Sequence, residues 1–108
     1  MSATHKIAHR ILSTPQEVTT LHRAGVWAVH FDTEARVYIV SHVATGIKVE
    51  PCDTLPEAKD IVDALAATYP DFAATAEWGK SIDAAPDVMD GIRSIVTNVA
   101  ADYEPESP

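Results

Sequence analysis

The sequence predicts an α+β protein in which a three- to four-stranded antiparallel sheet is packed on one face by two long helices. The first observation is residues 25–52, GVWAVHFDTEARVYIVSHVATGIKVEPC, where β-rich runs alternate with short polar breaks. The second is a pair of later segments with apolar residues at helical spacing. The third is size, because 108 residues with 46% hydrophobic content suit one globular domain with a buried core.

The centre of the predicted sheet is a meander over residues 26–50. Its strands are expected at 26–31, 36–43 and 47–50, joined by the turn sequences DTEA and ATG. Proline has no N–H for a sheet ladder, so Pro51 is expected to end the third strand. By alternation, the face expected to pack in the core carries Trp27, Val29, Phe31, Val37, Ile39, Val43, Ile47 and Val49. The opposite, polar face is expected to carry His30, Arg36, Tyr38, His42, Lys48 and Glu50.

The segments before the meander are shorter. Residues 4–12, THKIAHRIL, fit a strand or a helix, and the strand is preferred because the next segment has its own helix start. That start is TPQE at residues 14–17, where the threonine can cap, the proline fits the first turn and the glutamate completes a capping box. The sequence therefore predicts a short helix near residues 15–23, followed by Gly25 as its C-terminal glycine.

Three helices are expected after the meander. TLPE at residues 54–57 repeats the capping signature and opens a helix over residues 55–69, which the following proline ends. A short helix is expected near residues 72–78. The last helix is expected over residues 86–103, where an uninterrupted apolar stripe is typical of an amphipathic helix.

Residues 1–103 are expected to form a single globular domain, with residues 104–108 as a disordered tail. The lone Cys52 has no partner for an internal disulfide, and the N-terminus lacks the apolar run of a signal peptide. No apolar run approaches the ~20 residues that span a bilayer. We therefore expect a cytoplasmic protein with no membrane contact.

Charge is unevenly distributed along the chain, which has a net charge of −8. Residues 53–108 carry twelve acidic and three basic residues, whereas residues 1–52 carry four acidic and five basic ones. Such asymmetry bears on partners rather than on fold. It argues against a general nucleic-acid binder, whose footprint is basic, and favours a basic protein partner.

The polar sheet face is a candidate ligand-binding surface. Histidine and tyrosine rings can stack on a base or another ring, and the cationic groups can meet phosphate or carboxylate. The alternative is the solvated face of an antiparallel sheet, which is ordinarily polar. The candidate ligand-binding residues are His30, Arg36, Tyr38, His42 and Lys48.

The residues that could support metal binding or catalysis form no known pattern. His5 and His9 would be one turn apart if residues 4–12 were helical, and would then be able to share a zinc ion. No C-x-x-C pair, HExxH helix, phosphate loop or nucleophile elbow occurs. Ser41 and His42 are strand neighbours that point to opposite faces. We therefore assign no metal ligand, cofactor or catalytic residue, and a metal-dependent enzyme is the third hypothesis.

Residues 26–69 combine three strands with a following helix, with WAVHFD near the start and TLPEAK opening the helix. This order of elements resembles the small arm-binding domains of phage integrases. The resemblance implies DNA-facing strands rich in basic residues. Those basic residues are mostly missing here, so no site is carried over.

The leading hypothesis is a small, acidic, non-catalytic protein-binding module with a regulatory, anti-defence or antitoxin-like role. Its acidic helices can present carboxylates to a basic partner, or can be a solvated surface that aids solubility. The apolar stripe of residues 86–103 also leaves room for a homodimer. The candidate interface residues are Asp60, Asp63, Trp78, Asp87 and Asp90. The alternative is nucleic-acid or small-ligand binding through the polar sheet face.

Overall fold

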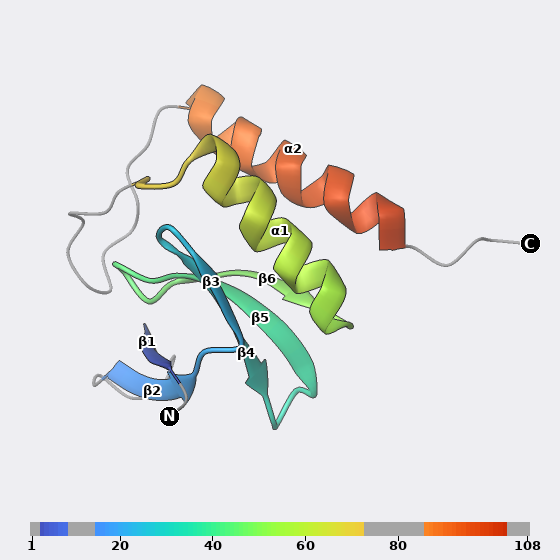
Figure 1. The fold of residues 1–108 in the computed structure, drawn as a ribbon. Helices are drawn as coiled ribbons and strands as arrows, with labels where there is room; N and C mark the ends of the chain where they lie inside the picture. Colours follow the sequence, from blue (N-terminus) through green and yellow to red (C-terminus); the bar gives the residue numbers. More distant parts are fainter. Residues whose placement is uncertain (1–2, 9–14, 73–85, 104–108) are drawn as a thin grey trace, which may run out of the picture.

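The computed structural model describes residues 3–8, 15–72 and 86–103, with a four-stranded antiparallel sheet at its centre. In spatial order its strands are β3 (His22–Ala24), β4 (Trp27–Asp32), β5 (Val37–His42) and β6 (Lys48–Cys52). Two helices cover one face of this sheet. A separate two-stranded hairpin, formed by β1 (Thr4–Ala8) and β2 (Pro15–Thr19), lies on the other face (Figure 1). The predicted α+β fold class is confirmed.

The helical layer consists of α1 (Leu55–Thr68) and α2 (Pro86–Tyr103), which run antiparallel to each other (Figure 1). The Thr54 hydroxyl accepts the Glu57 N–H at 3.4 Å, so the capping residue predicted at this helix start is in place. Helix α1 packs directly on β3, β4 and β5, and α2 packs on α1. Both long helices predicted from the sequence are confirmed.

The hydrophobic core lies between α1 and the sheet. On the sheet side it contains Trp27, Val29 and Val40, each at most 1% exposed. On the helix side it contains the apolar stripe Ala58, Ile61, Val62 and Leu65, all fully buried. Full burial of one large aliphatic or aromatic side chain contributes about 1.5–3 kcal/mol, so this layer accounts for much of the stability of the fold.

The short helix predicted at residues 15–23 is wrong, because this segment forms β2 and β3 instead. Strand β2 pairs with β1, which places Val18 opposite His5 and Gln16 opposite Ile7. The segment's β-branched residues favour a strand. The capping pattern was therefore overridden by strand pairing, and Leu21, between β2 and β3, is 41% exposed.

The faces of β5 are the reverse of the prediction. Trp27 lies opposite His42, and Phe31 lies opposite Tyr38, so these side chains share the face that the helices cover. Ile39 lies opposite His30 on the other face. Both faces of β5 are covered, and the run VYIV is apolar throughout. The alternation of polar and apolar residues therefore did not indicate which side chains of β5 lie on which face of the sheet.

Strand β6 continues through Pro51 to Cys52, so the prediction that Pro51 ends the strand is wrong. Among the described strands, β6 is the outer strand of the sheet and pairs only with β5. Proline is tolerated in an edge strand, because a missing N–H on the solvent side breaks no ladder hydrogen bond. The register shifts between Val40 and Ser41, where β6 contains a bulge.

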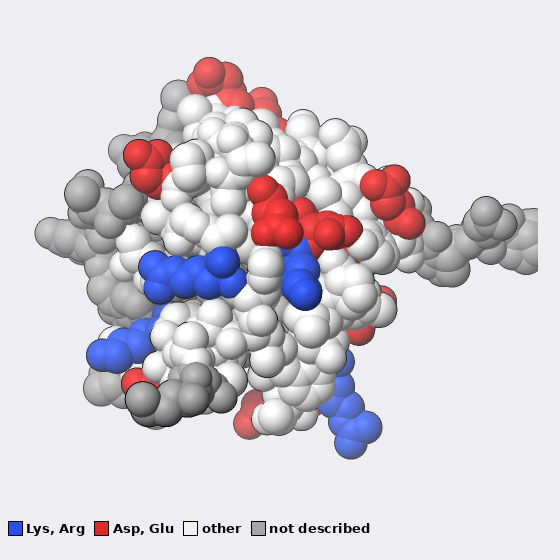
Figure 2. Space-filling view, viewed as in Figure 1, with Lys and Arg blue, Asp and Glu red and all other residues white. Residues whose placement is uncertain are grey.

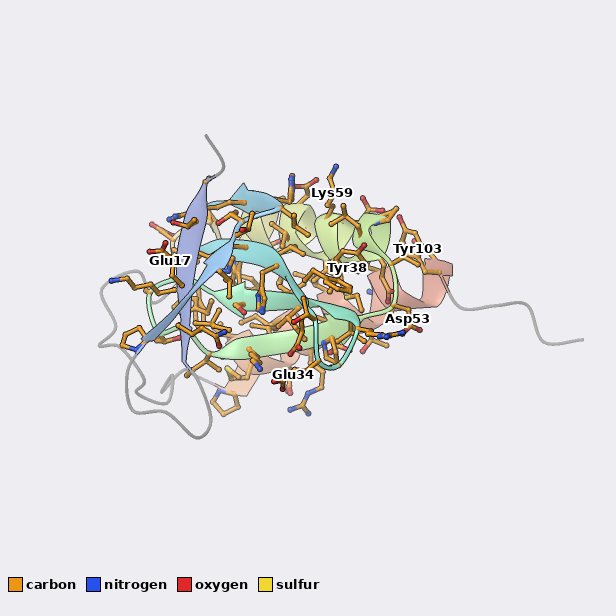
Figure 3. The ribbon with its side chains drawn as sticks, turned by 90° about the horizontal axis from the view of Figure 1, so that it is seen from below. Glu17, Glu34, Tyr38, Asp53, Lys59 and Tyr103 are labelled. Atoms are coloured by element: carbon orange, nitrogen blue, oxygen red, sulfur yellow. The ribbon has the colours of Figure 1, made fainter. Side chains whose placement is uncertain are left out.

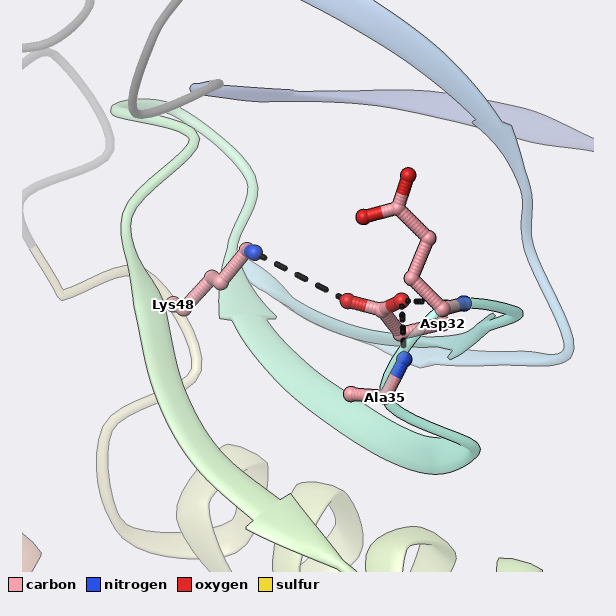
Figure 4. A network of polar contacts seen from close by, with 4 residues as sticks. Asp32, Ala35 and Lys48 are labelled. Atoms are coloured by element: carbon pink, nitrogen blue, oxygen red, sulfur yellow. Dashed lines mark hydrogen bonds and ion pairs between the residues drawn. The ribbon is translucent and has the colours of Figure 1, made fainter.

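The connection between β4 and β5 is organised by Asp32 (Figure 4). Its carboxylate accepts the N–H groups of Glu34 and Ala35 at 3.0 and 3.1 Å, and these hydrogen bonds hold the pKa of Asp32 below its usual range. Its other oxygen lies 4.0 Å from the Lys48 amine. Arg36, at the end of this turn, has a positive φ of 58°.

Two histidines are buried between the β1–β2 hairpin and the sheet; Figure 3 shows the hairpin from below, with Glu17 on its outer side. His5 and His30 are 5% and 3% exposed, and their rings meet edge to face with centroids 5.7 Å apart. Among the described residues, His5 Nε2 and His30 Nδ1 have no hydrogen-bond partner. Burial lowers the pKa of both rings, that of His30 to about 4.

The remaining predictions fall partly or wholly outside the described residues. The strand expected in residues 4–12 is confirmed as β1 for residues 4–8, and residues 9–12 lie outside the described part. In the helix expected near residues 72–78, Phe72 lies in a turn and residues 73–78 are not described. The tail at residues 104–108 lies outside as well.

Candidate partner-binding groove

A groove of about 440 Å³ runs between α2 and the outer strand of the sheet. On the sheet side it is lined by the apolar residues Trp27, Ile47 and Val49, and Phe72, which follows the end of α1, lines it as well. Its helix side is lined by Met89, Ile92 and Val96. The charged residues in its lining are Lys48, Glu50 and Arg93. We call this feature the α2–β6 groove.

Trp27 is a buried lining residue of the groove and is held from two directions. Its indole N–H donates to the Tyr69 carbonyl oxygen at 2.9 Å, and its ring stacks on Phe72 with centroids 6.0 Å apart. Tyr69 and Phe72 belong to the segment that leaves the end of α1. The fold therefore fixes this wall of the groove through a strand and a helix end at once.

His42, a predicted ligand-binding residue, supports the same wall from within the core. Its Nε2 lies 2.6 Å from the Phe72 carbonyl oxygen, which can only accept, so Nε2 carries the hydrogen. In the neutral ring, Nδ1 then accepts the Thr45 hydroxyl at 2.9 Å. His42 is fully buried and meets Trp27 edge to face, so it positions groove residues and does not face solvent.

Glu50 is the unusual residue of the groove. Val29 lies opposite Val40, and Val40 lies opposite Glu50, so all three side chains are on the helix-covered face of the sheet. Two of them are fully buried valines, and the third is a carboxyl group at the sheet edge. Burial raises the pKa of Glu50. The described ion pairs join His22 to Asp63 and Lys48 to Asp32, and neither includes Glu50.

The two cationic residues of the groove have different surroundings. The Lys48 amine lies 4.0 Å from an oxygen of the Asp32 carboxylate, and the lysine also contributes to the groove lining (Figure 4). Arg93 lies on the α2 wall and is exposed. The groove thus combines apolar walls with the charged residues Lys48 and Glu50 from β6 and Arg93 from α2.

The five predicted ligand-binding residues do not share a face. His30 lies beneath the β1–β2 hairpin, Arg36 ends the β4–β5 turn, and Tyr38 and His42 lie on the helix-covered side. Lys48 lies between the groove and Asp32. Tyr38 and His42 lie on the other side from the prediction because the phase assumed for β5 was wrong, whereas His30 and Lys48 share the hairpin-covered side and line one polar pocket.

The predicted interface residues form two separate groups. Asp60 accepts the Tyr103 hydroxyl, and Asp63 lies 2.6 Å from His22 Nε2. Asp87 and Asp90 are exposed in the first turns of α2, which lie at the opposite end of the antiparallel helix pair (Figure 1). Trp78 lies outside the described residues. Figure 2 shows acidic side chains gathered over the helical layer, with most visible basic side chains below it.

Sequence reasoning named the residues of the groove without recognising the groove. Ile47 and Val49 were assigned to the core, Glu50 to the polar face, and Met89 with its neighbours to the stripe of the last helix. The structure buries Ile92 and Val96 but leaves Met89 38% exposed. The available signal was the width of that stripe, which exceeds what one packing partner covers.

The fold and the groove together describe an α+β domain with an apolar site at the sheet edge. Comparison with family models, with curated proteins and with solved structures finds no match for this chain. The resemblance of residues 26–69 to integrase arm-binding domains thus gains no support.

Within the described residues, no three His, Cys, Asp or Glu side chains are placed to hold a metal ion. Neither α1 nor α2 has the length and apolarity needed to cross a bilayer.

Proposed function

We propose that this chain is a protein-binding module whose α2–β6 groove receives an apolar side chain of a basic partner protein. The observation that carries this proposal is the groove itself, an apolar hollow that stays partly open beside an exposed methionine. Exposed apolar hollows with polar rims are typical of interaction sites. A partner's apolar anchor is the kind of group that contributes most binding energy in such a pocket.

The charge of the molecule favours a basic partner over a second copy of the chain. Each chain carries a net charge of −8, and Asp87 and Asp90 lie within one turn of Met89, whose side chain lines the groove. Pairing two copies through this groove brings like charges together, whereas a basic partner meets opposite charge. Electrostatic steering by the acidic helices would also raise the association rate at low salt.

A second candidate function, small-ligand binding, is favoured by the volume of the same groove. Sites for small molecules commonly have about 300–1,000 Å³ and are mainly apolar with a few polar groups. The groove has about 440 Å³ and fits this description. The two functions differ in the size of the occupant, so the experiment below distinguishes them.

Replacing Met89 by aspartate is expected to weaken partner capture by about tenfold or more, because a carboxylate then opposes an apolar anchor. The measurement is quantitative affinity capture from a native lysate with wild-type and variant proteins. Leu21→Asp is the matched control, because Leu21 is 41% exposed against 38% for Met89 and does not line the groove.

The proposal is supported if basic proteins retained by wild type and Leu21→Asp are lost with Met89→Asp. It is contradicted if Met89→Asp retains the same proteins at the same level while its circular dichroism and melting temperature match wild type. Loss of a co-purifying small molecule alone would favour the second candidate function.

A further inference from the structure

We infer that Glu50 selects a lysine or arginine that lies next to the apolar anchor, on the same partner segment, at the edge of the α2–β6 groove. This inference rests on the proposed function and names the chemistry of its partner at one position. It concerns a single carboxyl group in an apolar lining rather than the general acidity of the helices.

The position of Glu50 in the sheet is the first support. Across β4, β5 and β6, the row that contains Glu50 otherwise holds Val29 and Val40, both fully buried on the helix-covered face. A third apolar residue here would extend the core to the sheet edge. The sequence instead places a carboxyl group there, in the lining of the groove and beside Val49.

The cost of that placement is the second support. Burial of a carboxylate among apolar groups without a counter-charge is unfavourable, and the raised pKa of Glu50 reflects this. A cation that enters the groove offsets this cost, because the pair forms where water is partly excluded. A lysine also has a long apolar stem that matches the apolar walls.

Arg93 is the internal competitor for Glu50, since the other cation of the lining, Lys48, pairs with Asp32. Arg93 and Glu50 both line the groove, but the described ion pairs do not join them. If Arg93 paired with Glu50 in solution, the groove would favour no cation, and an anionic occupant would be attracted instead. The experiment therefore includes an anionic probe and an Arg93 variant.

The probes are hexylammonium, 1-hexanol and hexanoate, which share an apolar chain and differ in charge. Binding is followed by ¹⁵N–¹H correlation spectra of the full chain at low salt. Hexylammonium is expected to shift the amide signals of Val49, Glu50 and Met89 and to bind at least about fivefold more tightly than hexanol. Glu50→Gln should abolish this preference.

Two variants serve as controls for charge and burial. Glu57→Gln removes a carboxyl group near Glu50 whose pKa is raised by burial and by the charges of Asp53 and Glu50, but Glu57 does not line the groove, so the preference should remain. Arg93→Gln removes the competitor and should preserve or increase the preference. Lowering the pH should also weaken the preference of the wild-type protein for hexylammonium, since protonation of Glu50 removes its negative charge.

The outcomes separate this inference from the proposed function. Hexanol binding in the groove without a preference for hexylammonium overturns the role of Glu50 and leaves the groove as a binding site. A preference for hexanoate, or a preference that survives Glu50→Gln, also overturns it. If no probe shifts the groove signals, the inference fails, while affinity capture with Met89→Asp decides the proposed function independently.

Discussion

Replacing Gly25 by alanine is expected to lower the free energy of unfolding by more than about 3 kcal/mol. Gly25 has a φ of 58° in the two-residue turn between β3 and β4, which an alanine adopts only at a cost. A Cβ atom there would also lie 2.3 Å from the Pro70 carbonyl oxygen. That oxygen accepts the Val26 N–H at 3.0 Å, so the turn and the end of α1 would have to separate.

The measurement is chemical denaturation of the purified variant beside wild type. Gly46→Ala is the comparison, since Gly46 also has a positive φ, 73°, in another turn and reports the conformational penalty. We expect Gly25→Ala to be clearly the more destabilising of the two. A loss no greater than that of Gly46→Ala would show that the contact between Gly25 and Pro70 does not constrain the fold.

The second large effect is a loss of about 3 kcal/mol of stability between pH 7 and pH 4 from His30. Its pKa in the folded protein is lowered from 6.5 to about 4, mainly by burial, with smaller contributions from His5 and Lys48 that Asp32 opposes. Above pH 6.5 the ring is neutral in both states. As the pH falls toward 4, the unfolded chain binds a proton that the folded chain excludes, so stability decreases and then levels off.

The test compares the pH dependence of unfolding for wild type and His30→Phe. Their difference isolates His30 from carboxyl groups that titrate in the same range. Phenylalanine also removes a buried nitrogen that lacks a partner among the described residues, so the variant should be at least as stable near pH 7. NMR titration of the His30 ring in wild type gives its pKa directly, and a value near 6.5 would contradict the buried arrangement.

The elements that sequence reasoning predicted correctly are those with redundant signals. Helix α1 has a capping threonine, an apolar stripe and a terminating proline, and the meander has alternating runs with polar turns. Residues 15–19 had a capping pattern but few apolar positions, and pairing with β1 decided their conformation. Local propensity is a weak prior where tertiary pairing competes with it.

The groove could not be predicted because it depends on which side chains of the sheet face the helices and which face the β1–β2 hairpin. The run from Val37 to Val40 is apolar on both sides, so the phase of β5 was undetermined until the β1–β2 hairpin was placed. The side on which Glu50 lies depends on that phase and on the bulge in β6. Its place among buried valines is therefore a property of the assembled sheet and not of the local sequence.

The total charge of the acidic residues could be predicted from the sequence, but their grouping on the folded protein could not. The charge of residues 53–108 was visible in the sequence, and Figure 2 shows acidic side chains over the helical layer. Their grouping was not visible, since Asp60 and Asp63 lie on α1, whereas Asp87 and Asp90 lie in the first turns of α2, which runs antiparallel to α1 (Figure 1). Only Asp87 and Asp90 begin the helix that forms a wall of the groove.

Site-specific photo-cross-linking at Met89 tests the central claim, that the α2–β6 groove binds a basic partner protein. A photoreactive phenylalanine analogue replaces Met89 in one variant and Leu21 in the other, because both residues are similarly exposed. We predict that irradiation in a native lysate yields an adduct with a basic protein from position 89 and not from position 21. Equal labelling from both positions, or an adduct from position 89 only with a second copy of the chain, would contradict the account.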